Sequence, residues 1–280
     1  NEIVTINGDS YYFDKDNGRR VTGRQALDNV NHKYFGYYYF DKDGKMVKDD
    51  FVTENGNLYY FDATGDQPNF VFVSDKAGNW YYMSDFKATK GFSGPMRFST
   101  TFIDRSQTQN KIITKELYGH QYYFDPKTGI MVTNRYVSDD QGNWYYFGAD
   151  GQTLNGFQTI DGYLHYFTEN GQQVKGDFIY YNNNIYYFDK DNGNLVTNQF
   201  VNRDDVWYYF GPDGKAVSGF QTINGQNLYF HEYGVQAKGQ LVTVDGKTYY
   251  FDPNTGEKWV NRSLTLNGTV YNFDNNGVAT

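Results

Sequence analysis

Short stretches of alternating apolar and polar residues, separated by turn residues, follow one another along nearly the whole chain. In residues 156–176, for example, one stretch at 157–160 and another at 163–167 flank the dipeptide Asp161-Gly162. Such alternation is typical of half-buried strands, and Asp-Gly between two strands favours a type I′ hairpin turn because both of its central residues adopt positive φ. No segment has the apolar spacing of a helix over three turns. The pattern therefore predicts an all-β chain built of hairpins.

The aromatic triplet Tyr-Tyr-Phe recurs along the chain at a spacing of about 21 residues. Near-copies such as His165-Tyr166-Phe167 continue the series, and one step of double length indicates a copy that has degenerated. A period this regular is typical of a repeat architecture. The last residues of the triplets and near-copies are Phe13, Phe40, Phe61, Met83, Phe124, Phe147, Phe167, Phe188, Phe210, Phe230, Phe251 and Phe273.

A single hairpin does not bury aromatic rings on its own, so each repeat must pack against its neighbours. In a strand, the Phe of the triplet and the Tyr two positions earlier share one face, while the middle Tyr points to the other. We therefore predict a β-solenoid of stacked hairpin repeats of about 21 residues, with one face of each hairpin in an inter-repeat core and the other partly exposed.

The repeat pattern fails between residues 84 and 121, where no Tyr-Tyr-Phe triplet occurs and Pro95 lies between Gly91 and Gly94. Glycine and proline in this density indicate a loop. The sequence thus predicts three segments: N-terminal repeats of about four units at 1–83, a degenerate repeat or excursion at 84–121, and regular repeats of about eight units at 122–280.

Composition and charge exclude several classes of protein. Aromatic residues make up 20% of the chain, which is incompatible with a disordered segment. The net charge of −8 without a basic stripe argues against nucleic acid as a partner. No apolar run approaches the ~20 residues of a membrane-spanning helix, so membrane insertion is not expected. The absence of Cys excludes disulfides and fits a secreted bacterial protein whose signal peptide lies outside this sequence.

The sequence contains no motif for catalysis and no complete metal site, so we predict neither a catalytic residue nor a cofactor. The Asp that follows each triplet occupies the position of a residue that begins a turn. The four His residues lack metal-ligand spacing, and no Gly-x-Ser-x-Gly or phosphate-loop motif occurs. Loops such as the one beginning at Asp41 lack the Gly and Glu of a calcium-binding EF-hand. Carboxylate density leaves room only for an adventitious surface calcium ion.

Exposed aromatic rings with polar neighbours are suited to carbohydrate, because a ring stacks on the apolar face of a pyranose while amides and Lys bind its hydroxyls. Two stretches, 156–176 and 219–239, follow the same pattern and offer a Gln, a Tyr eight residues later and a Lys nine residues after that. A Tyr of the next repeat is predicted to close each pocket. The alternative is that the rings pack between repeats and that Gln and Lys lie in solvated turns. The predicted carbohydrate-binding residues are Gln158, Tyr166, Lys175 and Tyr187 in the first set and Gln221, Tyr229, Lys238 and Tyr250 in the second.

The unit Gly-Phe-Gln-Thr-Ile-Asp-Gly … Tyr-Phe … Asn-Gly-Gln-Gln-Val-Lys-Gly resembles the glucan-binding repeats of bacterial glucansucrases, enzymes that polymerise glucose from sucrose. These repeats belong to a broader cell-wall-binding family, which is related to choline-binding modules and to the receptor-binding repeats of large clostridial toxins. The resemblance covers nearly the whole chain and is strongest at 122–273.

The resemblance implies a non-catalytic module that binds α-glucan such as dextran, or isomalto-oligosaccharides, in pockets between successive repeats. It also implies that the chain is an accessory domain of a secreted, cell-surface-associated sucrose-dependent glucosyltransferase, with that enzyme's catalytic domains as its partners. The unit beginning at Phe178 departs from the pattern, since it lacks the full set of Gln, Tyr and Lys.

Two other functions remain open. The chain is alternatively a cell-surface or toxin-type attachment module that binds another glycan or choline. Choline favours a cage of aromatic rings, Trp above all, and four Trp residues are too few for one cage in each repeat. A self-contained hydrolase is disfavoured because no unique pair of acidic residues stands out.

Overall fold

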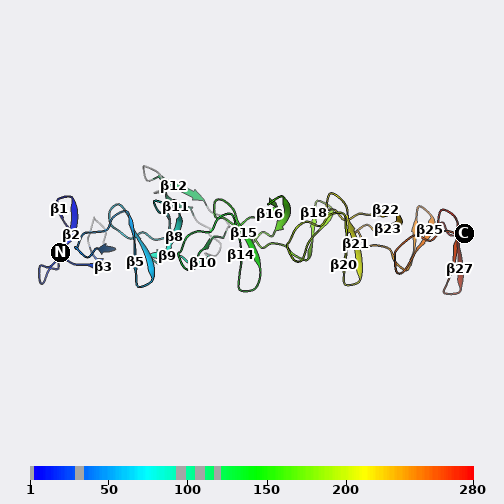
Figure 1. The fold of residues 1–280 in the computed structure, drawn as a ribbon, viewed down its shortest axis with the longest axis horizontal. Helices are drawn as coiled ribbons and strands as arrows, with labels where there is room; N and C mark the ends of the chain where they lie inside the picture. The colour runs from blue at the N-terminus through cyan, green and yellow to red at the C-terminus, as the bar shows by residue number, and fades with distance from the viewer. Residues whose placement is uncertain (1–2, 29–34, 93–98, 105–110, 117–120) are drawn as a thin grey trace. The chain divides into compact units, whose positions relative to one another are not determined.

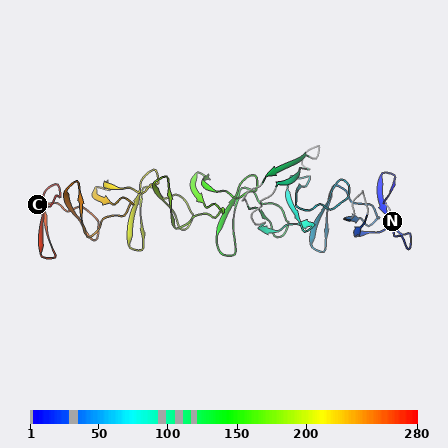
Figure 2. The same cartoon turned by 180° about the vertical axis from the view of Figure 1, so that it is seen from behind.

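The computed structural model describes all residues except 1–2, 29–34, 93–98, 105–110 and 117–120. Residues Asn1–Asn155 and Glu169–Gln172 form one compact unit, here unit 1, and residues Gly156–Thr168 and Gln173–Thr280 form a second, here unit 2. Within each unit the hairpins follow one another in chain order, as the colours in Figure 1 and the reverse view in Figure 2 show. The part of the chain that is described contains no helix that is long and apolar enough to span a membrane.

All the described regular structure consists of strands, as the sequence predicted. Unit 1 contains β1 (Ile3–Ile6), β2 (Asp9–Tyr12), β3 (Gly23–Leu27), β4 (Gly36–Phe40), β5 (Asp50–Glu54), β6 (Asn57–Phe61), β7 (Val71–Ser74), β8 (Trp80–Ser84), β9 (Lys87–Ala88), β10 (Gly91–Phe92), β11 (Ser99–Asp104), β12 (Lys111–Glu116), β13 (Tyr123–Phe124), β14 (Arg135–Ser138) and β15 (Trp144–Phe147). Unit 2 contains β16 (Gly156–Ile160), β17 (Tyr163–Phe167), β18 (Asp177–Tyr181), β19 (Asn184–Phe188), β20 (Gln199–Arg203), β21 (Val206–Phe210), β22 (Gly219–Ile223), β23 (Gln226–Phe230), β24 (Gln240–Val244), β25 (Lys247–Phe251), β26 (Arg262–Leu266) and β27 (Thr269–Phe273). In unit 2 each consecutive pair of strands forms a separate two-stranded antiparallel hairpin.

The predicted hairpin turns are confirmed by their backbone angles. Asp161 and Gly162 have φ of 52° and 85°, and Asn224 and Gly225 have φ of 52° and 80°. Both central residues of these turns therefore have the positive φ of a type I′ turn. The sequence missed the turns at 182–183 and 204–205, where Asn and Asp without any Gly adopt the same left-handed conformation.

The Asp residue after each triplet also has the predicted structural role. The Oδ1 atom of Asp189, for example, accepts hydrogen bonds from the backbone N–H groups of Asp191 at 2.9 Å and Asn192 at 3.0 Å. These bonds hold the turn that follows the hairpin, so this carboxylate satisfies backbone donors. The same role is filled by Asp14, Asp41, Asp62, Asp125, Asp252 and Asp274.

The segment that follows each turn, here called the return segment, forms backbone hydrogen bonds both with its own hairpin and with the preceding hairpin. In unit 2 the N–H of Val217 donates to the carbonyl of Tyr209 in its own hairpin, while the N–H of Ala216 donates to Ile185 in the preceding hairpin. The pattern repeats one unit later, where Ala237 donates to Tyr229 and Gln236 to Trp207. Main-chain hydrogen bonds therefore link each hairpin to the one before it.

Aromatic packing between neighbouring hairpins forms most of the core. The Phe that ends the triplet is fully buried in most repeats; Phe167, Phe188, Phe210, Phe230 and Phe251 in unit 2 are all 0% exposed, whereas Phe13 in the first repeat is half-buried. The middle Tyr of one triplet contacts the terminal Phe of the next, with ring centroids between 5.8 and 6.3 Å apart. The face that the sequence left partly exposed is thus half-buried against the following repeat.

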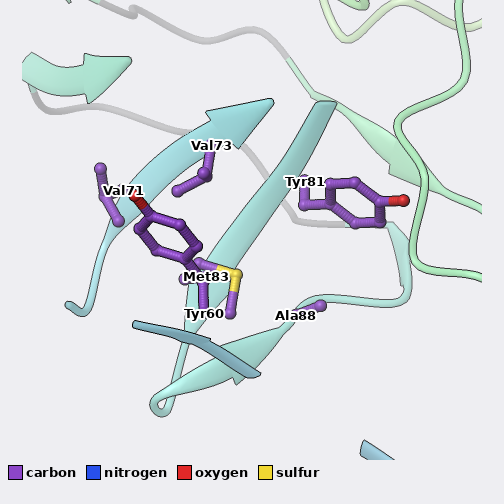
Figure 3. Close-up of a cluster of buried hydrophobic side chains, with 6 residues drawn as sticks. All are labelled: Tyr60, Val71, Val73, Tyr81, Met83 and Ala88. Carbon is purple, nitrogen blue, oxygen red and sulfur yellow. The ribbon is translucent and has the colours of Figure 1, made fainter. Parts of the chain in front are cut away.

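Unit 1 departs from the simple hairpin series at strand β7. β11 pairs with β7 in parallel and with β12 in antiparallel orientation, and together with β8 and β9 they form a five-stranded sheet. Figure 3 shows the buried cluster on this sheet, in which the ring of Tyr60 from the preceding hairpin packs with Val71, Val73, Tyr81, Met83 and Ala88.

The additional hairpin β11–β12 lies inside the segment 84–121, for which the sequence predicted a degenerate repeat or an excursion. Residues 93–98, 105–110 and 117–120 of that segment lie outside the described part of the chain. The division between the two compact units falls at Asn155 and Gly156. The predicted limits at 83 and 121 mark where the repeat pattern of the sequence is interrupted, and not where the compact units divide. They stay predictions.

One buried titratable side chain, His165 in β17, links pH to stability. It is 5% exposed, and its Nδ1 donates a hydrogen bond to the carbonyl oxygen of Gly193 at 2.9 Å. Burial lowers the pKa of His165, and the charge of Lys175 lowers it further, against the opposing effect of the Gly193 hydrogen bond. The folded chain therefore favours the neutral imidazole more strongly than the unfolded chain does.

The depressed pKa predicts a loss of stability on acidification. His165 contributes its full stability above the unfolded pKa of about 6.5, and the contribution is lost as the pH falls from there through the lower folded pKa. Substitution His165→Leu, which introduces the residue found at the equivalent position 228, should reduce the loss of unfolding free energy between about pH 7 and about pH 5. Urea unfolding at both pH values measures this, and an equal loss in both proteins would contradict it.

The aromatic core predicts a second difference in stability. Phe210 is 0% exposed and packs with Val196 and Val201, whereas Phe220 is 43% exposed. Substitution Phe210→Ala should lower the free energy of unfolding by about 3–5 kcal/mol because it leaves a cavity. Phe220→Ala is the matched control and should cost clearly less in urea unfolding followed by circular dichroism. Equal costs at the two positions would show that the terminal Phe is not the anchor of the repeat.

Candidate functional site

One pocket of unit 2 lies between hairpins β22–β23 and β24–β25, and we call it the Phe220 pocket. Its volume is about 420 Å³. That volume is within the range of small-molecule sites. Its lining combines two aromatic rings, one ammonium group and several amides and hydroxyls. The lining residues are Phe220, Gln221, Thr222, Asn227, Leu228, Tyr249, Lys258, Val260, Asn275 and Asn276.

Two neighbouring hairpins supply the aromatic wall of the Phe220 pocket. Phe220 is the second residue of β22 and pairs with Tyr229 across the hairpin. Tyr249, the first Tyr of the following triplet, approaches the Phe220 ring edge to face, with centroids 5.0 Å apart and an interplanar angle of 73°. Tyr229 supports the same ring from within its own hairpin at 5.0 Å. Phe220 is therefore fixed in orientation while part of its surface stays open to solvent.

The returning chain after β25 places a cation beside these rings. The backbone N–H of Lys258 donates to the carbonyl of Asn227 at 2.8 Å. Its Nζ lies 5.7 Å from the ring centroid of Phe220 and 5.6 Å from that of Tyr249, within the range of a cation–π contact. The pocket thus presents an ammonium donor next to an exposed ring, with amide groups of Asn227, Asn275 and Asn276 around it.

The equivalent place in the first predicted set is closed by another ring. Phe157 corresponds to Phe220, but it is surrounded by Tyr166, Tyr181 and Tyr186, whose centroids lie 4.9, 5.2 and 5.3 Å from its own. Tyr181 ends strand β18, and the corresponding last residue of β24 is Val244. The smaller Val leaves the Phe220 ring uncovered. The replacement of Tyr by Val is thus one difference between the open pocket and the closed position; another is Lys258, whose equivalent beside Phe157 is Leu195.

The structure divides the second predicted set among several locations. Gln221 borders the Phe220 pocket, and Tyr229 lies behind its aromatic wall. Lys238 lies elsewhere: its Nζ is 4.7 Å from the ring centroid of Trp207 and donates to the carbonyl of Asn254 at 2.9 Å. Burial lowers the pKa of this ammonium group. Tyr250 is 8% exposed and packs on Trp259 and Phe273.

The first predicted set is divided in the same way. Gln158 pairs with His165, whereas Tyr166 pairs with Phe157 one position away, so Gln158 and Tyr166 project from opposite faces of the hairpin. The Nζ of Lys175 donates to the carbonyl of Asp191 at 3.2 Å. The ring of Tyr187 packs on Phe178 and Phe210.

Strand periodicity explains this outcome. Tyr166 and Tyr229 contact the terminal Phe of the next repeat, which is the packing alternative considered for these rings. The ring that reaches a preceding hairpin is the first Tyr of the triplet, here Tyr249, and not the middle one, Tyr250. Direct contact of Tyr166 or Tyr229 with a sugar stays a prediction. The sequence analysis missed Phe220, Tyr249 and Lys258, although counting the period of two from the buried Phe251 identifies Tyr249.

A second pocket in unit 2 has the same position in the repeat. It has a volume of about 250 Å³ and lies beside hairpin β18–β19, the return segment at 216–218 and the turn at 232–234. Tyr180 and Tyr233 border it and are 65% and 63% exposed. The groove between a hairpin, the next return segment and the following turn therefore recurs, with side chains that differ from repeat to repeat.

The described residues provide no group of three or more His, Asp or Glu side chains able to hold a metal ion. The Asp residues of the turns use Oδ1 to accept backbone hydrogen bonds. The geometry of the Phe220 pocket provides ring surface and hydrogen-bonding groups. This arrangement can bind a polyhydroxyl ligand by stacking and hydrogen bonding, without a reactive group.

The fold and this pocket define the chain as a module of β-hairpin repeats with binding grooves between neighbours. The choline-binding repeat family matches residues 36–67, 106–153, 154–200 and 217–263, and a putative cell wall binding repeat matches 4–19, 72–85 and 198–216. The chain belongs to the family of choline-binding repeats. This membership confirms the predicted class of repeat and its non-catalytic character.

Two curated relatives are streptococcal enzymes. The chain is 36% identical to Glucosyltransferase-I of Streptococcus downei over 97% of its own length and 37% identical to Glucosyltransferase-S of Streptococcus mutans serotype c over 96%. It spans about a fifth of each relative, 21% and 19% respectively.

Solved structures of repeat proteins share the fold. Choline binding protein F of Streptococcus pneumoniae is 22% identical, with a TM-score of 0.56 over 100% of this chain and 92% of that chain. The choline-binding domain of CbpL from the same organism is 23% identical, with a TM-score of 0.55 over 79% of this chain and 99% of that chain. These likenesses confirm the all-β hairpin-repeat fold.

Proposed function

We propose that the chain is a non-catalytic carbohydrate-binding module that binds α-glucan of the dextran type, as an accessory domain of a secreted, cell-surface-associated glucosyltransferase. The observation that carries the proposal is the Phe220 pocket, where an exposed ring fixed by two Tyr rings lies beside Lys258 and several amides. Support for the parent enzyme comes from the two glucosyltransferase relatives, of which the chain spans about a fifth.

The chemistry of the pocket suits a neutral sugar. The exposed part of the Phe220 ring offers a surface for the C–H groups of a glucose face. The side chains of Asn227, Asn275 and Asn276 offer both donors and acceptors to hydroxyl groups, and Lys258 offers donors. A polar lining with a single open ring binds weakly in each site, on the order of millimolar or about −4 kcal/mol.

Weak sites become effective on a polymer. A glucan presents many identical glucose units, so two or more grooves of this kind on one chain can gain roughly 10²- to 10⁴-fold by effective concentration. The second groove, bordered by Tyr180 and Tyr233, is a candidate for such an additional site. Such a module would hold the polymer near the catalytic domains of the parent enzyme. Isomalto-oligosaccharides would occupy single grooves with little of this gain.

Choline is the ligand that the family name indicates, and it serves as the second candidate to be tested. A trimethylammonium group requires aromatic faces that are free to surround it. In the Phe220 pocket, Lys258 already lies over both rings, and at Trp207 the ring already faces the ammonium of Lys238. These lysines would compete with choline, whereas they add hydrogen bonds to a sugar hydroxyl. The geometry therefore favours glucan.

Covering the Phe220 ring should abolish its contribution to glucan binding. Substitution Val244→Tyr introduces the residue found at the equivalent position 181, where Tyr closes the site over Phe157. We expect the dissociation constant for dextran to rise about tenfold in affinity gel electrophoresis, because one stacked ring contributes about 1 kcal/mol or slightly more. Phe220→Ala should weaken binding to a similar extent.

Thr243→Tyr is the matched control, since it adds the same ring one residue earlier, on the opposite face of β24. It should retain the dextran affinity of the parent chain. Melting curves verify that each variant is folded. Unchanged dextran binding by folded Val244→Tyr and Phe220→Ala would rule out this pocket as the site, and retention on a choline resin without retention by dextran would support the second candidate.

Binding should need neither a metal ion nor a cofactor, because the pocket consists of rings, amides and an ammonium group. Treatment with EDTA is therefore expected to leave both the melting temperature and the dextran affinity unchanged. Differential scanning calorimetry and the same electrophoresis in EDTA measure these two quantities. A clear fall in either one, reversed by added calcium, would show that a bound ion is required.

A further inference from the structure

Unit 1 contains an arginine at a position of the first strand where several other repeats have an aromatic residue. Arg24 is the second residue of β3 and pairs with Tyr39, the middle Tyr of its triplet. In the same register Phe157 pairs with Tyr166, and Phe220 pairs with Tyr229. A guanidinium group thus occupies the repeat position that forms the aromatic wall of the Phe220 pocket.

Two rings and one amide hold the Arg24 side chain in place. Its Cζ lies 4.1 Å from the ring centroid of Tyr37 and 4.9 Å from that of Tyr59. Its Nε and Nη2 both donate to Oε1 of Gln67, at 3.0 and 2.8 Å. Gln67 is 2% exposed and uses its own Nε2 to donate to the carbonyl of Phe86. The guanidinium plane is therefore fixed by a buried network. We call Arg24, Tyr37, Tyr59, Gln67 and Phe86 the Arg24 cluster.

The positive charge of Arg24 is not neutralised by a neighbouring carboxylate. In the part of the chain that the structure describes, Arg24 forms no ion pair, unlike Lys45 and Arg203, which pair with Asp9 and Asp177. The carboxylates of Glu54 and Asp66 lie on the side toward which a Cβ atom on Gly23 or Gly36 would point. Successive residues of a strand face opposite sides, so Arg24 and Tyr37 point to the other side. In a chain of net charge −8, an oriented cation without an acidic partner is available to an external anion.

Exposed aromatic rings border this cation. Phe86 and Phe35 flank Tyr37 with ring centroids 5.3 and 5.2 Å from it, and they are 36% and 55% exposed. Phe86 has a φ of 61° because it is the second central residue, after Asp85 with a φ of 48°, of the two-residue turn between β8 and β9. The Oδ1 of Asn69 accepts a hydrogen bond from its N–H at 3.3 Å. This turn places the Phe86 ring at the border of the cluster, against Tyr37.

We propose that the Arg24 cluster is a second saccharide site, which selects a sugar carrying an oxyanion, either a carboxylate or a phosphate. The exposed faces of Phe86 and Phe35 would stack on the sugar ring, and the guanidinium would bind the oxyanion with charge-assisted hydrogen bonds. This site is distinct in residues and in ligand charge from the Phe220 pocket. The proposal goes beyond neutral glucan and does not depend on it.

The matched variant is Arg24→Phe, because it restores the residue type of the other repeats and removes only the cation. Calorimetric titration of the full chain with glucuronic acid, glucose 6-phosphate and glucose tests the site. We expect one or both acidic sugars to bind the parent chain, with about tenfold or greater weakening in Arg24→Phe and a smaller loss in Arg24→Lys. The two acidic sugars distinguish carboxylate from phosphate, and added salt should weaken both.

Val244→Tyr, which closes the Phe220 pocket, should leave the binding of acidic sugars unchanged and so separates this proposal from the preceding one. If Arg24→Phe melts below the parent chain, Phe86→Ala serves as the second variant and should weaken the same ligands. Equal affinity of the parent and folded Arg24→Phe for the acidic sugars would overturn the proposal. Binding of glucose or of inorganic phosphate as tight as that of the acidic sugars would overturn it as well.

Discussion

The contact between the middle Tyr of one triplet and the terminal Phe of the next is the interaction on which the rest of the structure depends. A two-stranded hairpin has too little apolar surface to be stable alone, so its rings must be buried by a neighbour. Pairs such as Tyr187–Phe210 and Tyr229–Phe251 supply that burial at nearly constant distance. Because each contact involves only adjacent repeats, the remaining positions of a repeat can vary without loss of the fold.

That freedom explains how binding grooves differ along one architecture. The second residue of the first strand is Phe in most repeats of unit 2, and its surroundings decide its role. Tyr181 covers Phe157, whereas Val244 leaves Phe220 open, and Arg24 replaces the ring by a cation. Stability and recognition are therefore assigned to different positions of the same repeat.

Charge is distributed according to the same division. The acidic residues that follow the triplets accept backbone hydrogen bonds in turns. At Asp125 these bonds and the bond from the Thr128 hydroxyl lower the pKa of the carboxyl group. Two cations that lie over aromatic rings are instead oriented by neutral acceptors: Lys238 by the carbonyl of Asn254 and Arg24 by the amide of Gln67. The grooves consequently present donors to a ligand, although the chain as a whole is acidic.

The sequence by itself determined the class of fold, because turn dipeptides such as Asp161-Gly162 and the periodic triplet act locally and need no distant partner. Of the residues that it predicted for binding, Gln221 borders the candidate pocket, and its contact with a sugar stays a prediction. Only the tertiary structure decided which rings meet across repeats. A period of two assigns Tyr249 and Tyr250 to opposite faces, but the face that meets the preceding hairpin is set by packing between neighbours. For that reason Lys258, distant in sequence from Phe220, was beyond the reach of spacing within a repeat.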